Sequence, residues 1–189
     1  MNKKPLVIAI AGGTCSGKST LTDILTQKFM EHEKVKVFNM DSYFKTDPPK
    51  VIAPITGDEY VEHNHPDALE KEKLQREFMK ALEEDWDIII IEGLFALHME
   101  QYRNAADIKI FVDLKSDERL ARRITKHMAW GQTFEQVTLR YLDTVRFRHD
   151  ELVEPSRWHA DIIINGTMDA NRGAEFVATM IREELKNNR

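Results

Sequence analysis

The segment AGGTCSGKST, residues 11–20, constrains the fold of this 189-residue chain more than any other. It follows the apolar run LVIAI and precedes a stretch with helical periodicity. Its pattern, Gly-x4-Gly-Lys-Ser, is that of a P-loop, in which backbone N–H groups and the positive end of a helix hold phosphates. The sequence therefore predicts a buried strand, a phosphate-binding loop and a helix in this order, with a nucleoside triphosphate bound at the loop.

Five apolar, β-branched runs recur along the chain and predict the strands of one sheet. They occupy residues 6–11, 35–38, 87–92, 107–113 and 160–165. Near-continuous apolar strands are typical of a parallel sheet that is covered on both faces, and helical patterns lie between these runs. We expect an α/β fold of the P-loop NTPase class, with a five-stranded parallel sheet of strand order 2-3-1-4-5, helices on both faces and a helical lid.

A single domain is expected over residues 1–189, because a chain of this length buries one sizeable core and is short for two. Residues of about 42–67 contain four prolines and predict an irregular excursion from the sheet, and a loop of this length is usually functional or disordered. A basic helix from Ser116 to about Gly131 lies in a segment, about 116–133, that we interpret as a lid over the triphosphate. A solvated helix face is the alternative for this segment.

The composition favours a small-molecule partner. The formal charge is -5 at pH 7, and a nucleic-acid surface needs clustered Lys and Arg, so we expect no nucleic acid. No run is long enough to span a membrane, and the first apolar run is too short for a signal peptide, so we expect neither membrane association nor export. The single cysteine, Cys15, cannot form an internal disulfide, which suits a cytoplasmic protein.

The residues expected to bind ATP form the loop and the first turn of the helix. They are Gly12, Gly13, Thr14, Cys15, Ser16, Gly17, Lys18, Ser19 and Thr20. In a P-loop the lysine reaches the terminal phosphates and the next hydroxyl binds Mg²⁺, which assigns these roles to Lys18 and Ser19. We interpret Cys15 as a small residue that the loop tolerates rather than as a redox group.

Two acidic residues stand where the second and third expected strands end. Asp41 follows the run 35–38, and Glu92 ends the run 87–92. Carboxyl ends of neighbouring strands meet beside the phosphate loop in this kind of fold. Asp41 could therefore accept the proton of an acceptor, and Glu92 could hold Mg²⁺ with Ser19. A plain turn at Asp41 and a plain strand end at Glu92 are the alternatives.

Six segments, in this order, resemble the uridine kinase family of P-loop nucleoside kinases. They are AGGTCSGKST (11–20), DSYF (41–44), HPDA (65–68), IIIIEGLFAL (88–97), KIFVDLKSDERLARRI (109–124) and YLDTVRFRHDELVEPSRWHADIII (141–164). The resemblance implies transfer of the γ-phosphate of ATP, bound with Mg²⁺, to the 5′-hydroxyl of a ribonucleoside. Members of the family often form homo-oligomers, so this too is implied.

The resemblance also implies roles for individual residues. The implied catalytic residues are Asp41 as general base, Lys18 at the phosphates, and Arg123 and Lys126 as lid cations. The implied substrate-binding residues are Asp41, Tyr43, Phe44, Asn64, His65 and Arg140, and the implied metal ligands are Ser19 and Glu92. Tyr43 and Phe44 could stack on a flat ring, or could equally belong to the core.

The chain departs from the family pattern on the acceptor side. The helix expected from about Ala68 to Glu84 leads straight into the strand 87–92, which leaves no room for the family's base-reading hairpin. Asn64 replaces an acid that holds ribose hydroxyls. Residues 130–132, Trp-Gly-Gln, stand where arginines usually flank a glycine, and Arg140 stands where the family often has glutamine.

Other interpretations of the acceptor stay open at this point. Nicotinamide riboside kinases are relatives that lack the full hairpin, and their Asp-x-Phe-Phe-Lys segment resembles residues 41–45. Phosphorylation of a sugar phosphate, as in phosphoribulokinases, is a further alternative. An ATP-binding regulatory protein with a degenerate acceptor site is the alternative from a different functional class.

Overall fold

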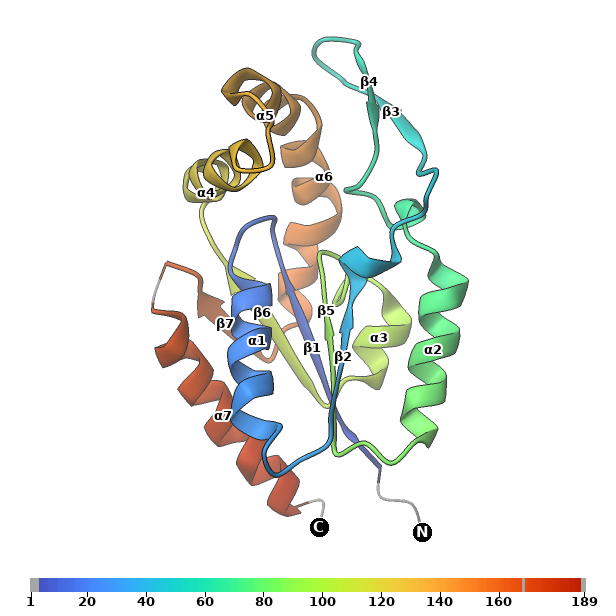
Figure 1. The fold of residues 1–189 in the computed structure, drawn as a ribbon, viewed down its shortest axis with the longest axis vertical. Helices are drawn as coiled ribbons and strands as arrows, with labels where there is room; N and C mark the ends of the chain where they lie inside the picture. The colour runs from blue at the N-terminus through green and yellow to red at the C-terminus, as the bar shows by residue number, and fades with distance from the viewer. Residues whose placement is uncertain (1–3, 168, 188–189) are drawn as a thin grey trace.

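A five-stranded parallel sheet forms the centre of the molecule, seen in a computed structural model that describes residues 4–167 and 169–187. The strands are β1 (Leu6–Gly12), β2 (Val35–Asn39), β5 (Ile88–Glu92), β6 (Ile108–Asp113) and β7 (Ile162–Asn165). They lie in the order β2-β5-β1-β6-β7 (Figure 1). Numbered among themselves, these five strands have the expected order 2-3-1-4-5, and every pairing is parallel.

Four helices cover the two faces of this sheet. They are α1 (Lys18–Phe29) and α7 (Ala170–Asn187) on one face, and α2 (Lys71–Glu83) and α3 (Glu100–Ala105) on the other. Leu6, Ile8 and Ile10 of β1 pack toward α1 and α7, whereas the intervening Val7 and Ala9 pack toward α2 and α3. Because both faces are buried, the strands are apolar throughout instead of alternating.

A chain of helical segments follows β6 and rises above the carboxyl edge of the sheet (Figure 1). The segments are α4 (Ser116–Met128), α5 (Phe134–Arg140), a π-helical turn (Tyr141–Val145), α6 (Arg146–Arg148), a second π-helical turn (His149–Val153) and a 3₁₀ turn (Glu154–His159). The helix α4 ends three residues before the predicted limit. The chain reverses at Gly131, whose φ of +89° favours glycine.

The segment between β2 and α2 is more regular than its prolines predict. Here β3 (Lys50–Ile52) and β4 (Glu59–Val61) form an antiparallel hairpin, so the prediction of a wholly irregular excursion is wrong. Val51 and Tyr60, two residue types that favour strands, are paired across the hairpin. Two 3₁₀ turns, Met40–Tyr43 and Pro66–Ala68, flank it. Between α2 and β5 only residues 84–87 intervene, as expected.

Within residues 4–167 and 169–187, none of the helices combines the length and the apolar character that crossing a bilayer requires.

Candidate active site

The loop between β1 and α1 has the conformation that its sequence predicts. Gly17 ends the loop with a φ of +106°, and Cys15 has a φ of +58°, so both residues are left-handed. The N–H of Ser16 donates to the carbonyl of Gly13 at 3.2 Å. Loops that alternate between right- and left-handed residues form concave nests of N–H groups that bind anions. The loop therefore has the backbone form of a phosphate site at the start of α1.

Two buried side chains support this loop from behind. A Cβ atom at Gly13 would lie 2.6 Å from Nη1 of Arg119 and 3.0 Å from Cε1 of His149, so the site requires glycine. Arg119 donates through Nε to the carbonyl of Leu114 at 3.0 Å, and Nε2 of His149 lies 3.2 Å from Oε2 of Glu154. Burial, together with the charge of Arg119, lowers the pKa of His149. The loop thus rests on α4 and on the second π-helical turn.

Lys18 and Ser19 begin α1 and lie beside Glu92 at the end of β5. Nζ of Lys18, a residue only 8% exposed, lies 3.4 Å from the carbonyl of Gly13. The hydroxyl of Ser19 donates to Oε1 of Glu92 at 3.2 Å. Burial raises the pKa of Glu92, the charge of Lys18 opposes this shift, and the charge of Asp41 adds to it. A carboxylate held in such a place is stabilised by a cation that binds next to it.

The donor set at this point fits a magnesium ion that arrives with a nucleotide. Ser19 and Glu92 offer a hydroxyl and a carboxylate, which are the hard oxygen ligands that Mg²⁺ prefers. In the described part of the chain, no group of three or more His, Cys, Asp and Glu side chains could hold a metal ion alone. Mg²⁺ bound with ATP needs only one or two protein ligands, because phosphates and waters supply the rest. The pair therefore suits Mg²⁺ with ATP.

Asp41 lies one strand away from Glu92, as the parallel order predicts. Asn39, the last residue of β2, is opposite Glu92 in the strand register. Its side-chain oxygen accepts the N–H of Asp41 at 2.8 Å and so starts the 3₁₀ turn that follows β2. Asp41 is exposed and lines the same cavity as Lys18. An exposed carboxylate therefore stands beside the phosphate loop without belonging to it.

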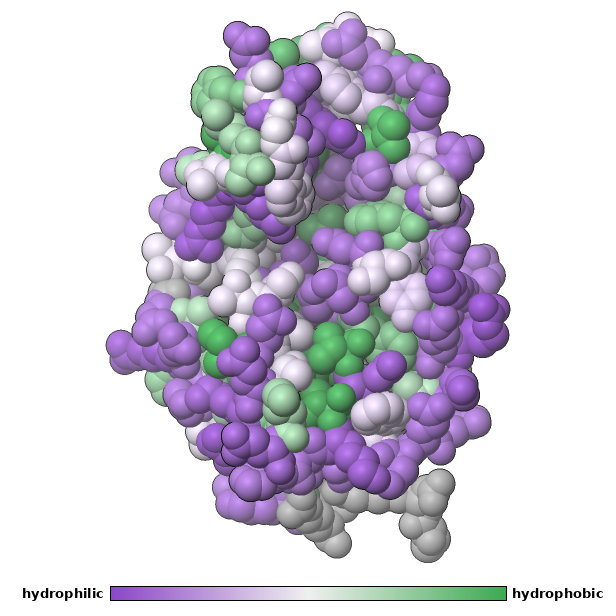
Figure 2. All heavy atoms as spheres, viewed as in Figure 1, coloured by the Kyte–Doolittle hydropathy of each residue, from purple (hydrophilic) through white to green (hydrophobic). Residues whose placement is uncertain are grey.

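A cavity of about 590 Å³ lies above the carboxyl edge of the sheet. Figure 2 shows the hollow on this face, below α4, α5 and the hairpin, with mainly hydrophilic residues around it. The charged side chains on its wall are Lys18, Arg122, Arg123, Lys126, Arg140 and Asp41. This excess of cations suits a ligand with several negative charges, such as a triphosphate.

Two cations of α4 reach the cavity. Nη1 of Arg123 donates to the hydroxyl of Thr14 in the loop at 2.9 Å, and Nε of Arg123 is buried without a hydrogen-bond partner in the described residues. Nζ of Lys126 lies 5.0 Å from the ring centroid of Trp130, a cation–π contact. Burial lowers the pKa of Arg123, but a guanidinium stays charged at neutral pH. An anion bound at the loop would offer Arg123 the acceptor that it lacks.

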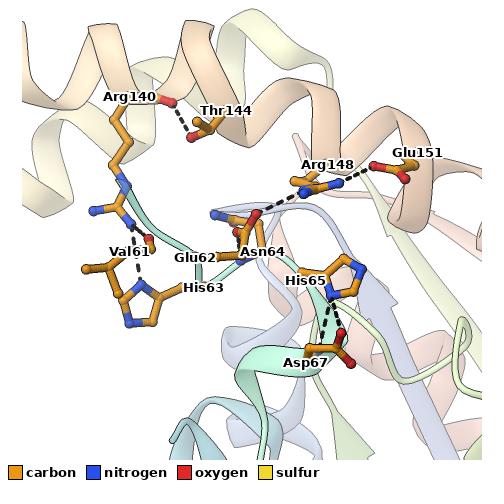
Figure 3. A network of polar contacts seen from close by, with 10 residues as sticks. All are labelled: Val61, Glu62, His63, Asn64, His65, Asp67, Arg140, Thr144, Arg148 and Glu151. Carbon is orange, nitrogen blue, oxygen red and sulfur yellow. Dashed lines mark hydrogen bonds and ion pairs between the residues drawn. The ribbon is translucent and has the colours of Figure 1, made fainter. Parts of the chain in front are cut away.

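The opposite wall of the cavity comes from residues before and after the hairpin and from the end of α5. Phe44 meets His63 edge to face, with ring centroids 5.1 Å apart. Arg140, from the end of α5, donates to the carbonyl of Val61 and lies 3.4 Å from Nδ1 of His63 (Figure 3). Burial, and then the charge of Arg140, lowers the pKa of His63. Phe44, Asn64 and Arg140, for which the resemblance implies substrate binding, thus line the same cavity as the phosphate loop.

The structure does not bring two of the predicted substrate-binding residues into the cavity. Tyr43 packs against the core, and its hydroxyl donates to Oε2 of Glu77 on α2 at 2.6 Å. Nδ1 of His65 accepts the N–H of Asp67 at 3.2 Å and caps the 3₁₀ turn there. Successive residues of a turn point in different directions, so Phe44 faces the cavity while its neighbour Tyr43 does not.

The predicted site residues do not include six that line the cavity, namely His63, Leu94, Arg122, His127, Trp130 and Gln132, nor Glu62 beside it. Glu62 is a buried acid, 3% exposed. For Trp130 the sequence contains a signal, because residues 130–132 differ from the family pattern of arginines on both sides of a glycine. No spacing or periodicity marks Glu62, whose partner Arg148 lies on a distant helix.

The chain is similar to known proteins over most of its length. The family model described as "Phosphoribulokinase / Uridine kinase family" matches residues 60–171. A uridine kinase from Anoxybacillus flavithermus is 30% identical over 212 residues, which cover 100% of this chain and 99% of that protein. A uridine kinase from Clostridium tetani is 32% identical over 188 residues, covering 87% of this chain and 88% of its own.

Solved structures support the fold. A structure titled as a possible uridine kinase from Bacillus stearothermophilus superposes with a TM-score of 0.53 at 21% identity, covering 86% of this chain and 89% of its own. A protein from Thermus thermophilus superposes with a TM-score of 0.61 at 16% identity, covering 97% and 99% of the two chains. At these identities the likeness concerns the arrangement of strands and helices and not the ligand.

Proposed function

The chain belongs to the phosphoribulokinase/uridine kinase family, and from this we propose that it transfers the γ-phosphate of ATP to the 5′-hydroxyl of a ribonucleoside. The observation that carries the proposal is the position of Asp41. Its exposed carboxylate shares one cavity with Lys18 of the phosphate loop. A protein that only holds ATP has no need of this second acidic group, whereas a kinase needs one beside the acceptor hydroxyl.

The donor side holds and orients the triphosphate in this proposal. The loop and Lys18 receive the phosphate oxygens, and the helix dipole of α1 favours their charge. Ser19 and Glu92 would hold Mg²⁺, which would supply positive charge to offset the negative charge on the phosphate groups during transfer. The β5 strand fixes Glu92 rigidly, because that strand is buried along its length.

Asp41 acts on the acceptor in this proposal. Its carboxylate accepts the proton of the 5′-hydroxyl while the hydroxyl oxygen forms a bond to the γ-phosphorus. The bond from that phosphorus to the bridging oxygen of ADP breaks, and ADP leaves. The hydrogen bond from the N–H of Asp41 to Asn39 holds the turn that presents the carboxylate. The acceptor itself would lie between Asp41 and the wall formed by Phe44 and Asn64.

The segment of about 116–133, which holds α4 and the turn after it, serves as a lid in this proposal. Arg123 and Lys126 line the cavity next to the loop and would stabilise charge on the moving phosphoryl group. Closure over the nucleotide would exclude water and suppress hydrolysis of ATP without transfer.

The residues of about 42–67 form the acceptor part of one domain, 1–189. A cytoplasmic homo-oligomer that binds neither membranes nor nucleic acid completes the proposal.

An acceptor panel tests this function. Purified protein is incubated with Mg²⁺ and ATP, and ADP is measured with uridine, cytidine, nicotinamide riboside, other ribosides and a sugar phosphate. We expect ADP formation that depends on a riboside, together with a 5′-monophosphate identified by mass. Slow hydrolysis that no acceptor increases would reject the proposal in favour of a regulatory ATP-binding protein.

A substitution at Asp41 tests the role of the carboxylate. Asp41→Asn removes the proton acceptor but keeps the shape of the side chain, so kcat should fall by about 10²–10⁴-fold while the Kd for ATP changes little. Asp47→Asn is the matched control, because Asp47 is an exposed carboxylate on the same segment that does not line the cavity. Equal rates for Asp41→Asn and the parent would contradict the proposed role.

A further inference from the structure

Glu62 is a buried acid that the proposed reaction does not use. It is 3% exposed, at the point where the chain leaves β4 and approaches the cavity. Its Oε2 accepts the Nε–H of Arg148 at 2.9 Å, across 86 residues of sequence. Its own N–H donates to the carbonyl of Pro49 at 2.7 Å. The side chain therefore ties the end of the hairpin to α6.

The second oxygen of Glu62 acts on a residue of the cavity wall. Oε1 accepts the N–H of Asn64 at 2.6 Å (Figure 3). Asn64 is 9% exposed and lines the cavity on the acceptor side. One carboxylate thus holds the backbone of Asn64 with one oxygen and the guanidinium of Arg148 with the other. A charge-assisted hydrogen bond to a backbone N–H is stronger than a neutral one, so the position of Asn64 is closely fixed.

Resting on the proposed function, we infer that Glu62, held by Arg148, is the positioning residue for the acceptor: it fixes Asn64 against the acceptor sugar and makes a neutral side chain at position 64 the favourable one. Oε1 of Glu62 lies 2.6 Å from the backbone N of residue 64, so a carboxylate on that residue would add a second negative charge within one side-chain length of the first. Arg148 is already shared between Glu62 and the exposed Glu151, at 2.6 Å. Two nearby carboxylates with one shared cation repel each other.

If the ion pair between Glu62 and Arg148 only stabilised the fold, a different result would be expected. A buried pair that only stabilises the fold would, once broken, lower the melting temperature and impair ATP and acceptor binding alike. The geometry here is local to the acceptor wall, since Glu62 and Arg148 contact neither Lys18 nor the phosphate loop in any hydrogen bond of the described residues. Substitutions at Glu62 should therefore change KM for the acceptor much more than KM for ATP.

The first test compares KM values for the two substrates. Glu62→Gln should raise KM for the acceptor about 10-fold, while kcat and KM for ATP stay within about 2-fold, because one lost charge-assisted bond is worth roughly a factor of ten. Glu59→Gln is the matched control, three residues earlier on β4, where an exposed ion pair with Lys50 is broken instead. Equal rises of both KM values in Glu62→Gln would overturn the inference.

The second test uses the direction in which a substitution at residue 64 changes KM for the acceptor. In the parent, Asn64→Asp should raise KM for the acceptor, because a second negative charge is added next to the one that holds the backbone of residue 64. In the Glu62→Gln background, Asn64→Asp should instead lower KM for the acceptor. The new carboxylate can then accept hydrogen bonds from the sugar hydroxyls without repulsion from residue 62. A structural role for Glu62 gives no such reversal, so the same sign in both backgrounds would overturn the inference.

The third test does not need turnover, and so separates this inference from the proposed function. Amide hydrogen exchange should rise at least several-fold in a peptide covering 60–66 of Glu62→Gln and stay unchanged in one covering 11–20. If Glu62→Gln does not fold, the double variant Glu62→Gln/Arg148→Gln, which leaves no unpaired buried charge, takes its place. Unchanged exchange at 60–66 would reject the inference. Missing acceptor turnover in the parent would reject only the proposed function.

Discussion

The phosphate side and the acceptor side of the cavity are built in different ways. On the phosphate side, Lys18 and Glu92 are 8% and 2% exposed and emerge from elements of the central sheet and its first helix. On the acceptor side, Phe44 and His63 are half-buried and come from turns around a two-stranded hairpin. Side chains of a distant helical run hold that hairpin in place, through Arg140 and Arg148.

The difference has a functional consequence. Strand pairing and core packing fix the phosphate side, so few substitutions there are neutral. A handful of polar contacts fixes the acceptor side, and each can be replaced without disturbing the sheet. Family members can therefore keep the same donor while the acceptor changes, which is the pattern expected of a function grafted onto a common fold.

The largest effect is expected on the phosphate side. Lys18→Met removes a buried cation from the loop, so kcat/KM for ATP should fall by about 10²–10³-fold. The Kd for the acceptor, measured by calorimetry without nucleotide, should stay within about 2-fold. The control is Lys28→Met on the same helix, which breaks only a surface ion pair with Glu175. An equal loss of acceptor affinity in Lys18→Met would show that the two sides are not independent.

An intermediate effect is expected on the acceptor side. Arg140→Met removes the donor to the carbonyl of Val61 and the cation next to His63. KM for the acceptor should rise by about 10-fold, which corresponds to about 1.4 kcal/mol, while KM for ATP changes less than about 3-fold. Arg76→Met on the exposed side of α2 is the control. A larger change in KM for ATP than in KM for the acceptor would place Arg140 in the nucleotide site instead.

The smallest effect concerns stability in weak acid. Burial lowers the pKa of His149 behind the phosphate loop and of His63 at the acceptor wall. As pH falls, the unfolded chain therefore binds protons at these histidines at a higher pH than the folded chain does. Their contribution to stability is complete above the ordinary histidine pKa of about 6.5 and is lost as pH falls below it. We expect Tm to drop between pH 7.5 and 5.5, by on the order of 3 °C for each kcal/mol lost.

Variants measure how much each of the two histidines contributes to the pH dependence of Tm. His149→Gln should flatten the decline of Tm more than His63→Gln, because His149 is 7% exposed and His63 only half-buried. Differential scanning fluorimetry at closely spaced pH values measures both slopes. A steeper decline attributable to His63 would reverse the comparison and identify the acceptor wall as the more tightly packed side.

The same contrast explains what could be predicted from the sequence. The phosphate loop and the apolar strands follow from local sequence patterns. The strand order and the placing of Asp41 near Glu92 follow from the P-loop fold class that these local patterns indicate. Tyr43 and His65 could not be placed from the sequence, since the orientation of a turn residue depends on partners such as Glu77. The contact between Glu62 and Arg148 is beyond any local pattern.

The π-helical turns in the run that follows α5 set which residues face the hairpin. In an α-helix, with about 3.6 residues per turn, eight residues make more than two turns, and side chains at 140 and 148 would diverge. A π-helical turn takes up an extra residue, so Arg140 and Arg148 both reach the chain at residues 61–62. Insertion or deletion of one residue here would rotate a new set of side chains toward the acceptor, which gives evolution a route to new substrates that leaves the sheet untouched.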